Sequence, residues 1–199
     1  MEGLKKIIKE RRSYYNLSDK SPVSDKEIKE LIDFAVLNVP SAFNSQTTRV
    51  VLLLNEHHTK LWDIVKDVLL KITGPDKFGP TKEKIETSFQ SGYGTILFYE
   101  DQSIIRGLQE QFSSYSEKFP GWSEHTSAMH QYAIWMLLED AGFGATVQHY
   151  NPVIDAEVAK TWNINPDWEL KCQMPFGIPT AKPGEKEFGP LEKRVLIFE

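Results

Sequence analysis

Aliphatic side chains recur every three or four positions along much of this chain, which is the spacing of one buried helix face. The pattern begins with Leu4, Ile7 and Ile8. These residues predict a short amphipathic helix over residues 3–12, with Arg11 on or beside its apolar side.

A second helix is predicted after Ser24, because Ser24 and Glu27 have the spacing of a capping box. Its apolar positions keep the helical period as far as Pro40, which cannot continue a helix. The run 49–54 that follows is rich in β-branched and aliphatic residues and predicts a buried strand.

The rest of the chain alternates between segments with the helical spacing and short runs of residues typical of strands. Gly and Pro residues predict a loop over 76–80, and the aromatic segment 115–122 predicts a second loop that could act as a lid. Helices are predicted at 59–72, 82–89, 104–108, 123–141 and 155–162, and strands at 95–99, 144–149, 169–177 and 194–199.

The order of these elements predicts an α+β fold, a mixed sheet packed with helices that include a long central helix at 123–141. Several connections do not repeat a strict strand–helix–strand unit, which argues against a doubly wound fold. The chain has 199 residues, so we expect a single domain over residues 1–199.

The composition fits a folded protein, with 40% hydrophobic and 26% charged residues. The net charge of −5 argues against a partner bound through a broad basic face, so we expect no nucleic-acid partner. The run Val50–Leu54 is far too short to cross a membrane, and the first residues lack the apolar centre of a secretory signal. Together with a single cysteine, Cys172, these features predict a cytoplasmic protein with no membrane association.

The usual signatures of catalysis are missing from the sequence. The five histidines include no helical pair with a nearby carboxylate, so we expect no metal site. The sequence has no Gly-x-Ser-x-Gly elbow and no Gly-x-x-x-x-Gly-Lys-Ser/Thr loop. The motifs that usually identify serine hydrolases and nucleotide triphosphatases are therefore absent from it.

A distributed set of polar segments remains. Arg11, Arg12 and Ser13 can hold a phosphate through charge-assisted hydrogen bonds, although arginines in a last helical turn also favour the negative end of the helix dipole. Segments 40–46 and 148–151 can hydrogen-bond a heteroaromatic ligand, or they can be ordinary loops and turns.

The order of these segments resembles the flavin-dependent nitroreductase family over essentially the whole chain. Arg-Arg-Ser stands near the start, then Pro-Ser-x-x-Asn-Ser-Gln, then Gly-Phe-Gly-Ala-Thr-Val-Gln-His-Tyr-Asn after the long helix, and Lys193-Arg194 near the end. Arg-Arg-Ser-Tyr-Tyr-Asn-Leu-Ser and Gln-His-Tyr-Asn-Pro are similar to a compact bacterial and fungal subgroup associated with oxidative stress and fatty-acid responses.

The resemblance implies a homodimeric α+β enzyme with FMN at the subunit interface. It implies that NADH or NADPH reduces FMN and that nitroaromatics or quinones reoxidise it, in a ping-pong hydride transfer through flavin N5. No side chain is then expected to be an essential catalytic acid or base. A flavin-binding sensor or storage module without significant turnover is the alternative, and a non-flavin interaction domain is a third.

The family motifs also imply roles for residues of this chain. Arg11, Arg12 and Ser13 would bind the FMN phosphate and ribityl chain, and Lys193 and Arg194 would close on the phosphate. Contacts with the flavin ring would come from Asn44 and Gln46, often supplied by the partner subunit, and from Lys84, Gln148, His149 and Tyr150.

Three aromatic residues, Tyr115, Phe119 and Trp122, are candidate walls of a pocket for nicotinamide and small aromatic acceptors, and aromatic core packing explains each of them equally well. The chain departs from many family members at Tyr15, where they have a basic residue, and at Thr47-Thr48, where they have Pro-Trp. These departures leave the substrate pocket and the nicotinamide preference open.

Overall fold

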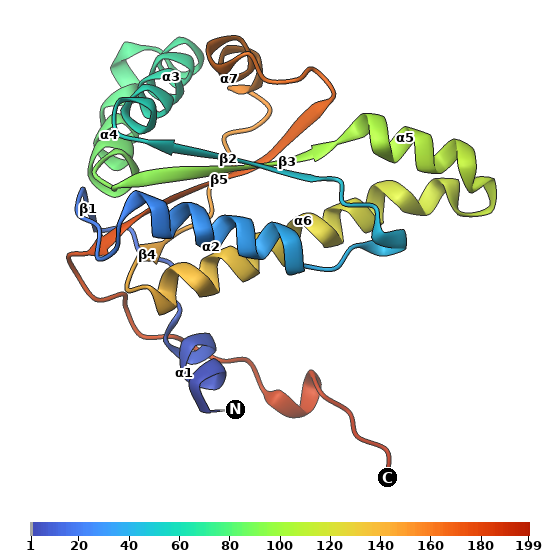
Figure 1. The fold of residues 1–199 in the computed structure, drawn as a ribbon. Helices are drawn as coiled ribbons and strands as arrows, with labels where there is room; N and C mark the ends of the chain where they lie inside the picture. The colour runs from blue at the N-terminus through green and yellow to red at the C-terminus, as the bar shows by residue number, and fades with distance from the viewer. Residues whose placement is uncertain (1) are drawn as a thin grey trace.

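The computed structural model describes residues 2–199 and has helices on both faces of an antiparallel sheet (Figure 1). The strand order is β1-β5-β3-β2, and β4 pairs with β5. All eight residues of the central strand β3 are buried, because both faces of the sheet are covered. The strands are β1 Leu17–Ser18, β2 Thr48–Leu54, β3 Gly94–Asp101, β4 Gly144–Ala145 and β5 Trp168–Pro179.

The sheet packs against helices on each face through its own apolar core. α2 and α6 pack on one face, whereas α3, α4 and α7 pack on the other (Figure 1). The helices are α1 Glu2–Glu10, α2 Asp25–Asn38, α3 Glu56–Thr73, α4 Pro75–Ile85, α5 Gln102–Gln111, α6 Phe119–Asp140 and α7 Asp155–Trp162. The predicted α+β fold with a long central helix is therefore confirmed, although the strands pair antiparallel where a mixed sheet was expected.

The predicted capping box at the start of α2 is also confirmed. The Ser24 hydroxyl accepts a hydrogen bond from the Glu27 amide at 3.3 Å, and the Glu27 carboxylate accepts one from the Ser24 amide at 2.8 Å. The two bonds satisfy amide groups that the first helical turn leaves free.

The loop predicted over 76–80 is wrong, because these residues belong to α4. Pro75 occupies the first turn, where its missing N–H costs nothing, and Pro80 lies within the helix. Packing against α3 and burial of Phe78 and Ile85 hold the helix together despite Pro80. The predicted helix over 82–89 is its continuation, which ends in a π-helical turn at Glu86–Gln90.

The loop predicted over 115–122 is also wrong. Ser113–Lys118 forms a 3-10 helix, and α6 begins at Phe119, four residues before the predicted start at Ser123. Pro120 fits the first turn of α6, and the buried Phe119 side chain anchors that turn.

Strand boundaries near the end of the chain differ from the prediction. The strand predicted over 144–149 shortens to β4, followed by an isolated bridge between Gln148 and Gln173, and β1 was not predicted. Residues 194–199 form no strand, because no sheet edge of the described chain pairs with them and β-propensity alone does not order an exposed segment. Within residues 2–199 no helix has the length and apolarity needed to cross a membrane.

Candidate functional site

One segment near the start of the chain and one from its last twenty residues meet beside β4 and form a basic hollow. This hollow, called the basic hollow below, has a volume of about 500 Å³ and is lined by residues 11–16 and 181–186. Arg12 Nη2 donates a hydrogen bond to the Gly184 carbonyl at 2.6 Å, and the Thr180 amide donates one to the Asn16 carbonyl at 2.9 Å. Its charged lining is Arg11, Arg12, Lys182, Lys186 and Glu185, so the hollow favours an anion.

Arg11 has unused hydrogen-bonding capacity inside this hollow. Its guanidinium carbon lies 4.3 Å from the centre of the Trp135 ring on α6, and among residues 2–199 its buried Nε has no hydrogen-bond partner. A buried donor without an acceptor is costly unless a ligand supplies one. A phosphate group fits this donor set, because its oxygens accept the charge-assisted bonds that guanidinium groups make.

Ser13 and Tyr14 are held against the sheet by β4. Ser13 forms a parallel bridge with Ala145, and the Tyr14 amide donates to the Ala145 carbonyl at 3.1 Å. A Cβ atom on Gly144 would lie 2.7 Å from the Tyr14 ring and 2.6 Å from Pro179. The absence of a side chain at position 144 therefore allows the segment that carries both arginines to approach the sheet.

An aromatic wall, formed by Tyr15, Phe89 and Tyr150, adjoins the basic hollow at Tyr15. The rings of Tyr15 and Tyr150 each lie 6.2 Å from the buried Phe89 ring, and Lys84 Nζ lies 5.8 Å over the same ring. Burial raises the pKa of Tyr150, and nearby Tyr15 raises it further. Phe89 sits in the π-helical turn after α4, so that turn gathers Lys84 and both tyrosines around one ring.

Gln173, a residue that the sequence did not single out, organises the predicted segment 148–150. Its backbone exchanges two hydrogen bonds with Gln148, at 2.7 and 2.9 Å. The Gln173 side-chain oxygen accepts from the Tyr150 amide at 2.7 Å, and its side-chain nitrogen donates to Asn151 Oδ1 at 3.3 Å. The polar side chain of Gln173 in the otherwise apolar stretch 172–176 was the available signal.

Asn44 and Gln46 lie far from the basic hollow. Phe43, Asn44 and Gln46 all have positive φ angles, of 57°, 50° and 49°, and the Gln46 amide donates to Ser41 Oγ at 3.0 Å. Such strained backbone collects at functional sites. Phe43 stacks on Trp122 of α6, whereas Arg11 stacks on Trp135 of the same helix, so the helical rise separates the two segments by about 20 Å along its axis.

The three aromatic residues predicted to line a substrate pocket gather around Phe43. The Phe43 ring centre lies 5.7 Å from Trp122 in a stacked pair, 5.3 Å from Phe119 and 5.7 Å from Tyr115. Phe119 is buried, whereas Tyr115 and Phe43 are each 49% exposed. In one chain these rings form an aromatic cluster that supports the strained segment 43–46.

Lys193 and Arg194 do not reach the basic hollow. Lys193 ends a short 3-10 helix at Leu191–Lys193, and both residues are exposed on the segment that runs to the chain end. The hollow is closed instead by Lys182 and Lys186, which the sequence did not single out.

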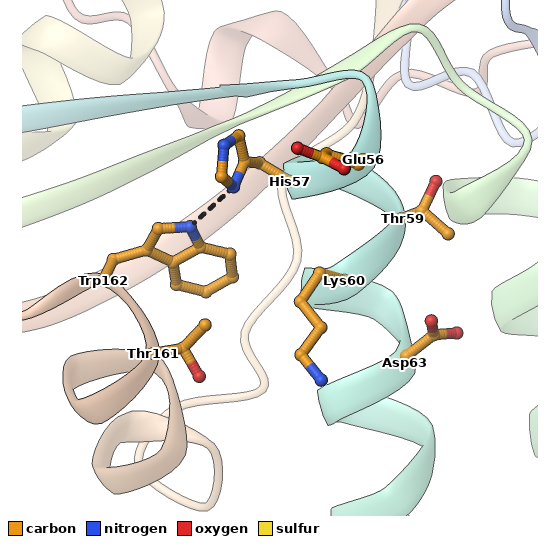
Figure 2. Close-up of a pocket in the computed structure, with 7 residues that line it drawn as sticks. All are labelled: Glu56, His57, Thr59, Lys60, Asp63, Thr161 and Trp162. Atoms are coloured by element: carbon orange, nitrogen blue, oxygen red, sulfur yellow. Dashed lines mark hydrogen bonds between the residues drawn. The ribbon is translucent and has the colours of Figure 1, made fainter.

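A second hollow, of about 550 Å³, lies between α3 and α7 (Figure 2). There the Trp162 indole N–H donates to His57 Nδ1 at 3.2 Å, and Lys60 and Asp63 extend from α3. This hollow shares no lining residue with the basic hollow and contains none of the predicted site residues.

Known proteins match this chain over almost its full length. The model of the Nitroreductase family matches residues 8–178. Nitroreductase FRM2 of Saccharomyces cerevisiae is 32% identical over 183 residues, which cover 91% of this chain and 90% of that protein. The structure of nitroreductase CinD from Lactococcus lactis in complex with chloramphenicol has a TM-score of 0.88 and 39% identity, and the match covers 98% of each chain.

Further structures share the fold. CinD is also described in complex with nicotinic acid and with 4-nitrophenol. A nitroreductase with bound FMN from Desulfitobacterium hafniense has a TM-score of 0.72 over the full length of both chains, at 16% identity.

Proposed function

Because the chain belongs to the nitroreductase family and is an oxidoreductase of that type, we propose that it is an FMN-dependent enzyme that oxidises NADH or NADPH and reduces nitroaromatics or quinones. The observation that carries the proposal is the basic hollow, in which the buried Arg11 Nε lacks a partner among residues 2–199. The FMN-bound structure of the same fold adds support for the flavin.

The residues around the basic hollow suit the two ends of FMN. Arg11, Arg12 and Ser13 would hold the phosphate and the ribityl chain, since guanidinium and hydroxyl groups donate to their oxygens. Within the aromatic wall, Tyr15 and Tyr150 would lie beside the ring system and the buried Phe89 would support them from behind, with Lys84 as a nearby cation.

FMN, when bound, would supply the hydride chemistry of the reaction. The residues of this chain would bind and orient it and keep water from the reacting ring. Gln173 holds segment 148–150 in place through three hydrogen bonds, which use the Gln148 amide, the Gln148 carbonyl and the Tyr150 amide. The segment Gln148, His149 and Tyr150 would therefore meet the ring edge through the main-chain groups that remain, chiefly those of His149. This arrangement needs no catalytic acid or base from the protein.

We further propose that the enzyme is a homodimer in which Asn44 and Gln46 of one copy complete the flavin site of the other. The separation of about 20 Å along α6 supports this, because one chain cannot bring segments 11–13 and 44–46 together. α2 and α6 also expose large apolar side chains, with Phe34 57% and Leu37 83% exposed. Sedimentation velocity should find a dimer, and a monomer that retains FMN would contradict this part of the proposal.

The acceptors are proposed to be small aromatic molecules. CinD, which is 39% identical to this chain, has been described with chloramphenicol and with 4-nitrophenol. In the proposed dimer the aromatic cluster that contains Tyr115, Phe119 and Trp122 would lie near the flavin with segment 43–46 and would wall the acceptor pocket. The free, buried Cys172 agrees with a proposed cytoplasmic location.

Steady-state kinetics test the proposal. We expect the FMN-loaded protein to oxidise NADH or NADPH rapidly when 4-nitrophenol or a quinone is present, with parallel lines in double-reciprocal plots. FMN binding without acceptor-dependent turnover would instead identify a sensor or storage module. Failure to bind FMN would refute both.

A further inference from the structure

Arg11 is held in the basic hollow by an aromatic ring and not by an ion pair. Arg49 and Arg106 pair with carboxylates at 3.1 and 2.5 Å, whereas within residues 2–199 no carboxylate lies within 4.0 Å of Arg11. Its guanidinium carbon lies instead 4.3 Å from the centre of the Trp135 ring. The Trp135 ring, over which the guanidinium lies, is therefore the contact that holds this group in place of a carboxylate.

Stacking leaves the hydrogen-bonding groups of Arg11 free for a ligand. The N–H groups of a guanidinium lie in its own plane, so a ring packed on one face does not use them. An ion pair would occupy one edge of the group and neutralise its charge. Arg11 keeps both its positive charge and its donors, which include the buried Nε.

The surroundings of Arg11 are polar and unsatisfied. Trp135 Nε1 and Glu139 Oε2, one helical turn apart on α6, are also buried without a hydrogen-bond partner among residues 2–199. Burial raises the pKa of the Glu139 carboxyl, and the charge of Arg11 lowers it, so the two groups lie close in space. Three unpaired polar groups at one place are unusual in a packed protein and mark a site arranged for something more than packing.

We propose that Trp135 is a positioning residue that presents Arg11 to the phosphate of the flavin and thereby gives the site its preference for FMN over riboflavin. The inference rests on the proposed function, because it assumes that a flavin binds in the basic hollow. Trp135 itself does not contact the reacting ring. Its effect is restricted to the phosphate end of the ligand.

The affinities for FMN and for riboflavin separate this role from a structural one, because riboflavin has no phosphate. Both can be measured on the apoprotein by quenching of flavin fluorescence. Trp135→Leu should weaken FMN binding by about five- to tenfold, the range of a partly desolvated cation–π contact, and should leave riboflavin binding almost unchanged. Trp135→Phe keeps an aromatic face and should recover most of the FMN affinity.

Two further variants make the test specific. Arg11→Ala alone and Arg11→Ala combined with Trp135→Leu should bind FMN equally, because Trp135 acts only through Arg11. Trp162→Leu, which removes a tryptophan on α7 outside the basic hollow, should leave both affinities unchanged.

The outcomes are distinguishable. Equal losses of FMN and riboflavin affinity in Trp135→Leu, or additive losses in the double variant, would show that Trp135 only supports the fold and would overturn the inference while leaving the proposed function intact. A wild-type protein that binds neither flavin would remove the proposed function, and this inference with it.

Discussion

Replacing Gln173 by methionine should destabilise the protein through one segment of the site. Gln173 is fully buried, and its side chain accepts from the Tyr150 amide at 2.7 Å and donates to Asn151 Oδ1 at 3.3 Å. Methionine has a similar length and fills the same space, so the variant removes two hydrogen bonds without opening a cavity.

The expected loss follows from what each partner can do afterwards. The Tyr150 amide is left without its acceptor, which costs about 1–2 kcal/mol for a partly buried donor, and the half-buried Asn151 side chain can turn toward water at a smaller cost. Together the two losses lower the free energy of unfolding by about 2 kcal/mol. For a chain of this size the melting temperature should fall by about 4–8 °C.

Thermal unfolding followed by circular dichroism measures this loss. Gln131→Met is the matched control, because Gln131 makes one side-chain bond, to Ser127 Oγ at 3.1 Å on α6, and its removal should cost less than about 0.5 kcal/mol. If Gln173→Met melts at the wild-type temperature, or no lower than the control, the Gln173 side chain does not hold segment 148–151 and the reasoning is wrong.

Three other predictions follow from the same structure. Gly144→Ala should lose about 1–3 kcal/mol of stability in urea unfolding, because the new Cβ would lie 2.6 Å from Pro179 and 2.7 Å from the Tyr14 ring; wild-type stability would contradict this close approach. Arg11→Ala should weaken FMN binding by about 1.5–3 kcal/mol in a fluorescence titration, and an unchanged affinity would remove Arg11 from the phosphate site. Burial lowers the pKa of His58 in the folded protein to about 4, whereas in the unfolded chain His58 keeps its ordinary pKa of 6.5. Between these two pH values the unfolded chain binds a proton at His58 and the folded protein does not. Stability should therefore be full above about pH 7 and fall by up to about 3 kcal/mol as the pH drops from about 6.5 to about 4, and a His58→Gln variant with the same pH dependence as the wild type would refute this.

Local sequence patterns predicted most helices of the fold, because their signals lie within a few residues. The spacing of Ser24 and Glu27 alone was enough to predict where α2 begins, and both capping hydrogen bonds are present. The errors arose where tertiary contacts outweighed local preference. Pro80 stays within α4 because Phe78 and Ile85 are buried, and residues 194–199 form no strand because no edge pairs with them.

The site residues came from the order of the motifs, and their roles toward a flavin stay predictions. Arg11, Arg12 and Ser13 are adjacent in the chain and line one hollow. Asn44 lies near the end of α6 that carries Trp122, away from the Trp135 end that contacts Arg11. This separation depends on how α6 packs and could not be predicted from local sequence.

The sequence carried no signal for Trp135 or for the two lysines of the basic hollow, Lys182 and Lys186. In the sequence Trp135 is one of many apolar residues on α6. Its contact with Arg11 depends on where α1 packs against α6, which the sequence does not show. Lys182 and Lys186 join the basic hollow because residues 181–186 return beside residues 11–16, although well over a hundred residues separate them in the chain.

The visible absorption spectrum of one anaerobic sample tests the central claim most directly. The purified protein, reconstituted with FMN and freed of unbound flavin, should be yellow, should bleach when NADH or NADPH is added, and should regain its colour when a nitroaromatic or a quinone follows. A protein that remains colourless after reconstitution, or a yellow protein whose colour neither nicotinamide changes, would contradict the claim that this chain is a flavin-dependent nitroreductase.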